Sequence, residues 1–189
     1  MRTIILGSGK GSNCKAILDA STSGLLGSAE IVGVCSDKKE SGILEVARSA
    51  SVPDFFLGNY DKSKDDPWVE KLTKLKPDLI VLAGFMRVLS KTFIDSFSSK
   101  IINLHPSLLP SFRGLHAIEQ AWNAGVKITG CTVHWISAEL DSGEIIAQAP
   151  VRIMFGDTLD SVAAKIHAAE HMLLPTVISQ LSRKVSSNE

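Results

Sequence analysis

The stretch that decides the fold is Ile101-Ile-Asn-Leu-His-Pro-Ser-Leu-Leu-Pro110. Its first residues are apolar and β-branched or bulky, which is typical of a short buried strand. The two prolines cannot continue a central strand, so the chain must leave the sheet directly after His105. Asn103 and His105 are therefore placed at the carboxyl end of the strand, the edge where ligands bind in open α/β sheets. An amide can donate to a developing oxyanion and an imidazole can move a proton near neutral pH, so the pair predicts acyl-type chemistry.

Outward from this strand, short apolar runs alternate with longer amphipathic segments. Strands that alternate with helix-length segments are typical of βαβ units. We therefore expect a Rossmann-like α/β fold, with a mostly parallel sheet and helices on both faces. The predicted strands are Thr3–Leu6, Ile31–Cys35, Leu79–Leu82 and Ile101–Leu104, and the predicted helices are Asn13–Ser23, Gly42–Ala50, Trp68–Leu75, Leu89–Phe97 and Ala117–Asn123.

The chain after Gly125 follows a different pattern. Val126–Ile136 and Glu144–Val151 have the character of strands and are separated by a loop. Two strands joined in this way predict an antiparallel pair added to the sheet near its C-terminal part, so that the sheet is mixed. A long helix is expected after Thr158, its N-cap, with a kink at Pro175.

The rest of the chain adds no further unit. The tail Ser182–Glu189 is polar and is expected to fray. Internal repeats, low-complexity tracts and linkers are absent from the sequence. We therefore expect residues 1–189 to form a single domain.

Composition excludes several classes of protein. The chain has 20 basic and 20 acidic side chains, so no net field favours nucleic acid or an anionic membrane. The three cysteines, Cys14, Cys35 and Cys131, have neither zinc-ligand spacing nor an even number, which argues against a metal site and a disulfide framework. The apolar start is too short for a signal peptide, and no apolar run could span a bilayer. We expect a cytoplasmic protein.

A glycine-rich turn, Gly7-Ser-Gly-Lys-Gly-Ser-Asn13, follows the first predicted strand and opens the first helix. Backbone N–H groups and the helix dipole favour an anion at such a turn, most often phosphate. A Walker A loop is excluded, because Lys10 is followed by glycine. A dinucleotide site fits imperfectly, since Ser12 replaces the third glycine, although Asp37 follows the second strand and could bind a ribose. The remaining alternative is a tight turn without a ligand.

A carboxylate, Asp141, lies in the loop between the two late strands. Beside His105 it would orient the imidazole and favour its protonated form, as a general acid or base requires. Each residue alone has a simpler explanation, since Asp-Ser-Gly is an ordinary turn and a histidine can bond a backbone carbonyl. Catalysis is favoured because Asn103, His105 and Asp141 occur with an anion-binding turn in one fold.

Several segments, spread in order over almost the whole chain, carry a resemblance to a known family. They are Ile4-Ile-Leu-Gly-Ser-Gly-Lys-Gly-Ser-Asn13, Leu82-Ala-Gly-Phe-Met-Arg-Val-Leu89, Asn103-Leu-His-Pro-Ser-Leu-Leu-Pro110, Gly114-Leu-His-Ala117, Gly130-Cys-Thr-Val-His134, Glu139-Leu-Asp-Ser-Gly-Glu-Ile-Ile146 and Glu170-His171. In these segments the chain closely resembles the folate-dependent phosphoribosylglycinamide formyltransferases. The resemblance implies formyl transfer from 10-formyltetrahydrofolate to the amine of glycinamide ribonucleotide in purine synthesis, with no metal.

The resemblance also implies roles for individual residues. Asn103, His105 and Asp141 match the catalytic residues. Those that match the ribonucleotide site are Gly11, Ser12, Asn13, His167 and Glu170, and those that match the folate pocket are Met86, Arg87, Val88, Leu89, Asn103, Ser137, Ala138, Glu139, Leu140 and Asp141. Lys62 and Lys64 are equal candidates for a basic contact to folate. The implied partners are these two small molecules, with no nucleic acid and no membrane, and homodimerisation is an open option.

Three alternatives stay open at this point. A formyltetrahydrofolate deformylase or a methionyl-tRNA formyltransferase is expected to carry a further domain and gives no reason for the glycine turn. A dinucleotide-dependent oxidoreductase would use Gly7–Ser12 and Asp37 and would bind NAD. A folate-binding protein without catalysis would not need Asn103, His105 and Asp141 together.

His134, inside a predicted strand, is interpreted as a packed or backbone-bonded histidine, with a supporting role through the family match.

Overall fold

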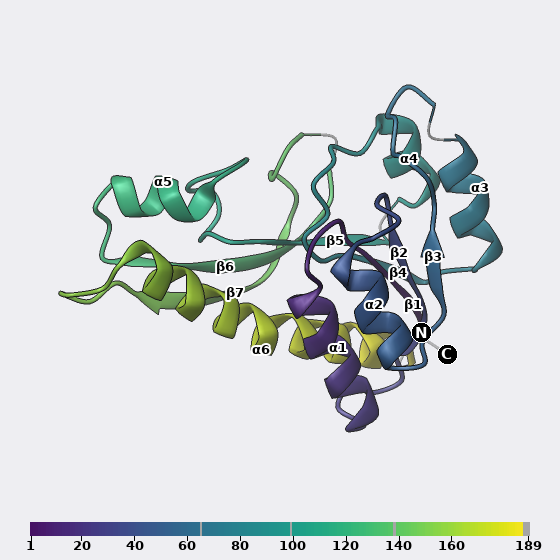
Figure 1. Ribbon diagram of the computed structural model, residues 1–189, viewed down its shortest axis with the longest axis horizontal. Coiled ribbons are helices and arrows are strands. Elements are labelled where there is room, and N and C mark those ends of the chain that lie inside the picture. The colour runs from purple at the N-terminus through teal and green to yellow at the C-terminus, as the bar shows by residue number, and fades with distance from the viewer. Residues whose placement is uncertain (65, 99, 138, 187–189) are drawn as a thin grey trace.

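The computed structural model describes residues 1–64, 66–98, 100–137 and 139–186. Its centre is one seven-stranded sheet in the order β3-β2-β1-β4-β5-β6-β7 (Figure 1). The strands are β1 Arg2–Leu6, β2 Glu30–Ser36, β3 Asp54–Phe56, β4 Leu79–Leu82, β5 Ile101–His105, β6 Ile128–Trp135 and β7 Ile145–Arg152. The helices are α1 Ser12–Thr22, α2 Gly42–Ser49, α3 Asp66–Lys74, α4 Lys91–Ser96, α5 Ala117–Asn123 and α6 Leu159–Ser186.

The sheet is mixed in the way that the sequence predicts. Strands β1 to β5 pair in parallel, while β6 runs antiparallel to β5 and β7 antiparallel to β6. In Figure 1 the β6–β7 pair extends away from the parallel part of the sheet, between α5 and α6. The strand order reverses between β1 and β4, which in open α/β sheets is the point where ligands bind. The predicted fold class is confirmed.

Helices cover both faces of the sheet. On one face α1, α2 and α6 bury apolar side chains that include Ile17, Leu44 and Ile166. On the other face α3 and α4 bury a second set that includes Leu72 and Phe93. Two separate cores form because successive side chains of a strand point to opposite faces. Among the residues placed in the structure, none of the helices combines the length and the apolarity needed to cross a membrane.

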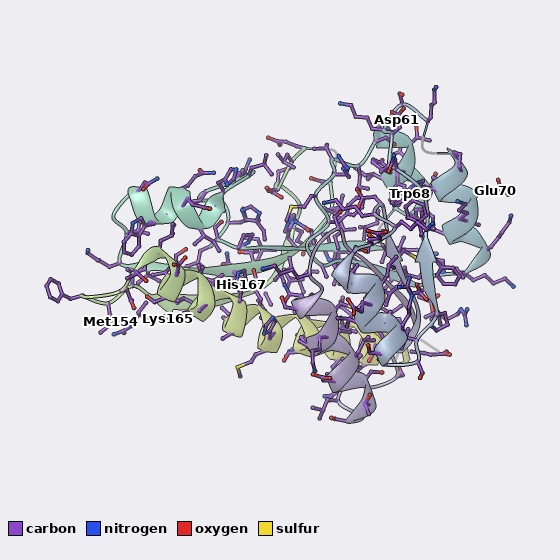
Figure 2. The ribbon with its side chains drawn as sticks, in the orientation of Figure 1. Asp61, Trp68, Glu70, Met154, Lys165 and His167 are labelled. Atoms are coloured by element: carbon purple, nitrogen blue, oxygen red, sulfur yellow. The ribbon has the colours of Figure 1, made fainter. Side chains whose placement is uncertain are left out.

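Helix α3 illustrates how the amphipathic pattern places a helix on the sheet. Trp68 is 3% exposed and packs with the second core, whereas Glu70 is solvated and pairs with Lys74 one turn later. Figure 2 shows Trp68 on the inner side of α3 and Glu70 pointing outward. The apolar stripe therefore sets which side of the helix faces the sheet.

The largest difference from the sequence expectation is β3. This strand has three residues, follows Pro53, and pairs in parallel with β2 at the edge of the sheet. A run so short carries too few residues to show a periodicity, so the sequence pattern does not predict it. Elsewhere the boundaries shift by a few residues. The helix expected from Leu89 begins at Lys91, because Ser90 is its N-cap and its Oγ accepts from the Phe93 N–H at 2.9 Å.

Helix α6 confirms one expectation and corrects another. Thr158 caps the helix as predicted, since its Oγ1 accepts from the N–H of Ser161 at 3.2 Å. Pro175 lies inside α6, which continues beyond it. The expectation that the chain frays from Ser182 is wrong. Ser182 is buried, and its hydroxyl bonds the carbonyl of Leu26 at 3.0 Å, so tertiary contacts extend the helix.

Candidate active site

Three segments of the chain leave the sheet at the same edge. Strands β1, β4 and β5 are parallel neighbours, so their carboxyl ends lie side by side. The glycine turn follows β1, the segment Gly84–Leu89 follows β4, and β5 ends at His105 as predicted. The loop between β6 and β7 and the helix α6 supply the remaining residues of the candidate site.

The amide of Asn103 is oriented by a histidine on the neighbouring strand. Asn103 and His134 are directly opposite in the β5–β6 register, so their side chains share one face of the sheet. The Nδ1 of His134 lies 2.9 Å from the Trp135 carbonyl, which can only accept, so Nδ1 carries the ring proton. Nε2 of the same ring then accepts from Nδ2 of Asn103 at 3.2 Å. Burial lowers the pKa of His134, which favours this neutral ring.

His105 lies between two oxygen atoms. Its Nε2 is 2.8 Å from the carbonyl oxygen of Phe112, which can only accept, so Nε2 carries a proton. Its Nδ1 is 3.4 Å from Oδ2 of Asp141. A second proton on Nδ1 would produce an imidazolium with an acceptor at each nitrogen. Both ring nitrogens of His105, which is only 4% exposed, therefore face an oxygen atom that can accept a hydrogen bond.

Asp141 connects the two histidines. Its Oδ2 accepts from the N–H of Gly114 at 2.8 Å and faces His105, while its Oδ1 lies 3.7 Å from Nε2 of His134. Its backbone has a φ of +49°, in the left-handed region that aspartate tolerates better than most residues. The structure thus brings Asp141 next to His105 and within 3.7 Å of His134, the ring that accepts from Asn103.

The glycine turn leads into α1, and the N-cap residue of this helix has no side chain that could cap the first backbone N–H groups. Gly11 is the N-cap, with a φ of +86°, and a Cβ at this position would lie 2.7 Å from Cα of Ile43. Only glycine fits this position. The first turn contains no acidic residue, so its backbone N–H groups and the helix dipole favour an anion.

A second group of predicted residues converges between α1 and α6. Nδ2 of Asn13 donates to Oε2 of Glu170 at 3.0 Å, and Nδ1 of His167 lies 3.0 Å from the same oxygen. The hydrogen bond to Glu170 raises the pKa of His167, whose side chain is half exposed on α6 (Figure 2). Oδ1 of Asn13 is buried and has no hydrogen-bond partner among the described residues. A polar ligand could therefore meet an amide oxygen, a carboxylate and a charged imidazole here.

The residues predicted to form the folate pocket lie on two segments. Met86 and Val88 are 65% and 62% exposed after β4, and Leu140 is 56% exposed in the β6–β7 loop. Leu89 is half-buried. Such exposed apolar side chains at a sheet edge are suited to a flat ring system.

The polar members of this predicted pocket make local contacts. Ser137 bonds the carbonyl of Glu139 at 3.0 Å, and Glu139 pairs with Arg113 at 3.6 Å. Ala138 lies outside the described residues. Lys62 and Lys64 are both exposed, so the choice between them stays a prediction.

The oxidoreductase alternative loses its acidic residue in the structure. Asp37 is fully buried, and its Oδ2 accepts from Nε of Arg87 at 2.7 Å, so its carboxylate does not face a ribose.

Burial raises the pKa of the Cys14, Cys35 and Cys131 thiols to about 12, which leaves them unreactive. Within the part of the chain that the structure describes, no cluster of three or more His, Cys, Asp and Glu side chains could hold a metal.

Sequence reasoning misses three groups that complete the site. They are the His134 ring as the orienting partner of Asn103, the Phe112 carbonyl beside His105, and the Gly114 N–H beside Asp141. The first could be found from the sequence only with the β5–β6 register, because a shift of one residue would put His134 on the other face. The other two are backbone groups and leave no signature in side-chain composition.

Comparison with known proteins shows the family to which the chain belongs. The formyl transferase family matches residues 1–178. The phosphoribosylglycinamide formyltransferase of Bacillus subtilis is 38% identical over 94% of this chain and 92% of its own length. The crystal structure of glycinamide ribonucleotide transformylase 1 from Symbiobacterium toebii matches with a TM-score of 0.92 and 37% identity, covering 97% of this chain and 88% of that one.

The chain belongs to the formyl transferase family. It is also 40% identical, over 95% of its length, to the trifunctional purine biosynthetic protein adenosine-3 of Drosophila melanogaster. The chain spans only 14% to 18% of the length of such trifunctional relatives.

Proposed function

We propose that this chain transfers the formyl group of 10-formyltetrahydrofolate to the primary amine of glycinamide ribonucleotide. The observation that carries the proposal is the contact of Asp141 with His105, next to the amide of Asn103 and at the same sheet edge as the start of α1. Relatives named phosphoribosylglycinamide formyltransferase, which match almost the whole chain, support this choice of substrate.

The acceptor end of the proposed site is built for a phosphorylated amine. The N–H groups at the start of α1 would bind the phosphate, with Gly11, Ser12 and Asn13 around it. Glu170 and the free Oδ1 of Asn13 would accept hydrogen bonds from the sugar or the glycinamide, and His167 would add a donor.

The donor end fits a flat, mostly apolar molecule with a polar edge. Met86 and Val88 after β4, and Leu140 directly before Asp141 in the β6–β7 loop, offer exposed apolar side chains. Bound there, 10-formyltetrahydrofolate would supply a formyl group activated by its attachment to nitrogen. The proposed fit combines solvent-exposed apolar side chains, which the donor would cover, with a reaction centre that is largely buried.

The residues of the trio would act on the charges that develop during transfer. When the amine attacks, negative charge grows on the formyl oxygen, and the second N–H of Asn103 can donate to it. His105, as an imidazolium, can donate from Nε2 when this oxygen takes the place of the Phe112 carbonyl as acceptor. Each such donor typically lowers the barrier by about 3 kcal/mol. Asp141 would keep His105 oriented and charged, so that His105 can give its Nε2 proton to the leaving nitrogen and then take a proton back from the ammonium that the attacking amine has become.

The test is a spectroscopic assay for release of tetrahydrofolate, with and without glycinamide ribonucleotide. We expect release only when the ribonucleotide is present, with formylated ribonucleotide formed in equal amount. Release without ribonucleotide would identify a deformylase instead, and binding of NAD would support the oxidoreductase.

Further features of the protein follow from the same proposal. We infer that residues 1–189 form one formyltransferase domain, which a single sheet from β1 to β7 supports. Cytoplasmic localisation, homodimerisation, and action without nucleic acid or a metal stay predictions.

A further inference from the structure

The segment Gly84–Leu89 has no regular secondary structure, although the proposed function, on which this inference rests, makes it a wall of the folate site. Its Gly84 has a φ of +71° and starts the turn away from β4. An irregular segment keeps a defined shape only through contacts with its neighbours. The contacts that hold this segment therefore decide where its exposed side chains lie.

Neutral hydrogen bonds fix the path of its backbone. The Ser8 N–H donates to the Gly84 carbonyl at 3.0 Å, and the Met86 N–H donates to Oγ of Ser8 at 3.2 Å. At the far end, the Ser90 N–H donates to the hydroxyl of Tyr60 at 2.9 Å. These bonds hold the backbone at both ends but do not determine which way the side chains between them point.

A buried ion pair holds the middle of the segment. Asp37 follows β2 directly and is 0% exposed, and its Oδ2 accepts from Nε of Arg87 at 2.7 Å. Its Oδ1 is buried and has no hydrogen-bond partner among the residues that the structure describes. A buried carboxylate that is only half satisfied is costly, and an ion pair to a side chain that is 46% exposed contributes little to stability. Stability therefore does not explain why this pair is present.

The position of Arg87 in the segment suggests another role. Its neighbours Met86 and Val88 are 65% and 62% exposed, whereas the Arg87 side chain turns back to a buried partner. The ion pair fixes the direction of the half-exposed Arg87 side chain. Because the three residues share one backbone, it also limits how far Met86 and Val88 can turn at the sheet edge where the site lies.

We propose that Asp37 is a positioning residue for the formyl donor. By fixing Arg87 it presents Met86 and Val88 as a preformed apolar wall for the ring system of the folate. The Asp37 carboxylate does not contact the donor itself. Its effect is on the binding of one substrate and leaves the chemical step and the binding of the ribonucleotide unchanged.

The first test is steady-state kinetics of Asp37→Asn, which keeps the shape of the side chain and removes its charge. We expect the KM for 10-formyltetrahydrofolate to rise about tenfold, while kcat and the KM for the ribonucleotide stay within about twofold. Arg87→Lys keeps the charge but loses the planar Nε donor, so the same pattern is expected. The double variant should be no worse than either single one, because both changes remove one contact.

A second ion pair provides a matched control. Arg48 and Asp54 are 2.8 Å apart and join α2 to β3, without touching the segment after β4. Asp54→Asn should leave all three kinetic constants unchanged. An unchanged folate KM in Asp37→Asn, an equal rise in Asp54→Asn, or a fall in kcat alone would each overturn the proposal.

Two further measurements keep the outcome clear. If Asp37→Asn does not fold, Arg87→Lys decides, because Arg87 lies at the surface with a side chain 46% exposed. Equilibrium titration with tetrahydrofolate tests the wall without any turnover. Wild-type protein that binds tetrahydrofolate but forms no formylated ribonucleotide would contradict the proposed function alone. Equal tetrahydrofolate affinity of wild type and Arg87→Lys would contradict the role of Asp37 alone.

Discussion

The two ends of the candidate site are built in opposite ways. At the reaction centre, His105, Asp141 and His134 are 4%, 8% and 0% exposed, and their hydrogen bonds go to backbone groups and to the side chain of Asn103. At the ribonucleotide end, Ser12 at the start of α1 is exposed and the His167 side chain is half exposed, although Glu170 beside it is 4% exposed. The first region relies on side chains held out of water, and the second relies on backbone dipoles and charge at the surface.

This difference has an energetic reason. Donors and charges stabilise a developing oxyanion most strongly when they are fixed and shielded from water. Binding a phosphate requires only that N–H groups and positive charge meet the ligand as it arrives. We therefore expect substitutions at the reaction centre to reduce kcat and substitutions at the ribonucleotide end to raise KM.

The largest effect is expected from Asp141→Asn. Asparagine keeps the shape and tolerates the left-handed backbone at this position, but it cannot hold a charged His105. We expect kcat to fall on the order of 1,000-fold, with little change in the KM of the ribonucleotide. Steady-state kinetics measures kcat and KM, and the melting temperature checks that the variant is folded. Asp95→Asn, which changes an exposed i,i+4 pair with Lys91, is the control, and near-normal turnover of Asp141→Asn would refute the trio.

The next largest effect is expected from Gly11→Ala at the other end. The added Cβ would lie 2.7 Å from Cα of Ile43, so the turn must move and the N–H groups with it. Losing one hydrogen bond to a charged group corresponds to about a 10- to 100-fold rise in the KM of the ribonucleotide. Inorganic phosphate should also compete with the ribonucleotide in the wild type and much less in this variant.

Gly24→Ala is the matched control for this change. Gly24 has a φ of +70° and open space around it, so alanine there strains the backbone without touching the site. Both variants should lose about 1 kcal/mol of stability from the left-handed backbone, and Gly11→Ala should lose more because its Cβ also meets Ile43. Only Gly11→Ala should change the KM. Equal KM values in the two variants would mean that the glycine turn does not bind the phosphate.

A smaller, pH-dependent effect is expected from His167→Ala. The hydrogen bond to Glu170 raises the pKa of His167, so its positive charge is present at low pH and is lost as the pH rises through that pKa. The ratio of the ribonucleotide KM in the variant to that in the wild type should be about threefold at low pH and fall toward one at high pH. His116, the N-cap residue of α5, has an exposed side chain. His116→Ala should therefore give a KM ratio that does not change with pH. A flat ratio for His167→Ala would remove this residue from the binding site.

The smallest effect concerns stability at the reaction centre. Burial lowers the pKa of His134 below its ordinary 6.5, so the unfolded chain binds a proton that the folded chain does not. Unfolding is therefore favoured as the pH falls below that ordinary value. Urea denaturation between pH 7 and pH 5 should show a stability loss in the wild type that is shallower in His134→Gln. Parallel pH profiles would contradict a neutral, buried His134.

Much of the fold was predictable from local pattern. The alternation of apolar runs and amphipathic segments predicts the parallel strands, the helices on both faces and the antiparallel pair, because burial imposes a periodicity that the sequence must carry. The short edge strand β3 was not predictable, because its three residues are too few to show such a periodicity. The tail from Ser182 was mispredicted, because a polar composition does not show that the Ser182 hydroxyl is buried and bonds the Leu26 carbonyl.

The candidate site was predictable in its residues but not in its contacts. Asn103, His105 and Asp141 stand out as an amide, an imidazole and a carboxylate at a strand end and in a loop. The hydrogen bond of Asn103 to His134 depends on a strand register and is visible only in the structure. Asp37 shows the opposite case, because the sequence suggested a ribose-binding acid and the fold buries it against Arg87.

The sequence by itself determined which elements form and which chemical groups end at one edge of the sheet, because proline, glycine and apolar periodicity act over a few residues. Tertiary structure alone decided which of these groups touch, and in which protonation state they are held. The hydrogen bond of His105 with the Phe112 carbonyl and its 3.4 Å contact with Asp141 join residues brought together only by packing. Burial, which lowers the pKa of His134, is likewise a property of the assembled fold and not of any local segment.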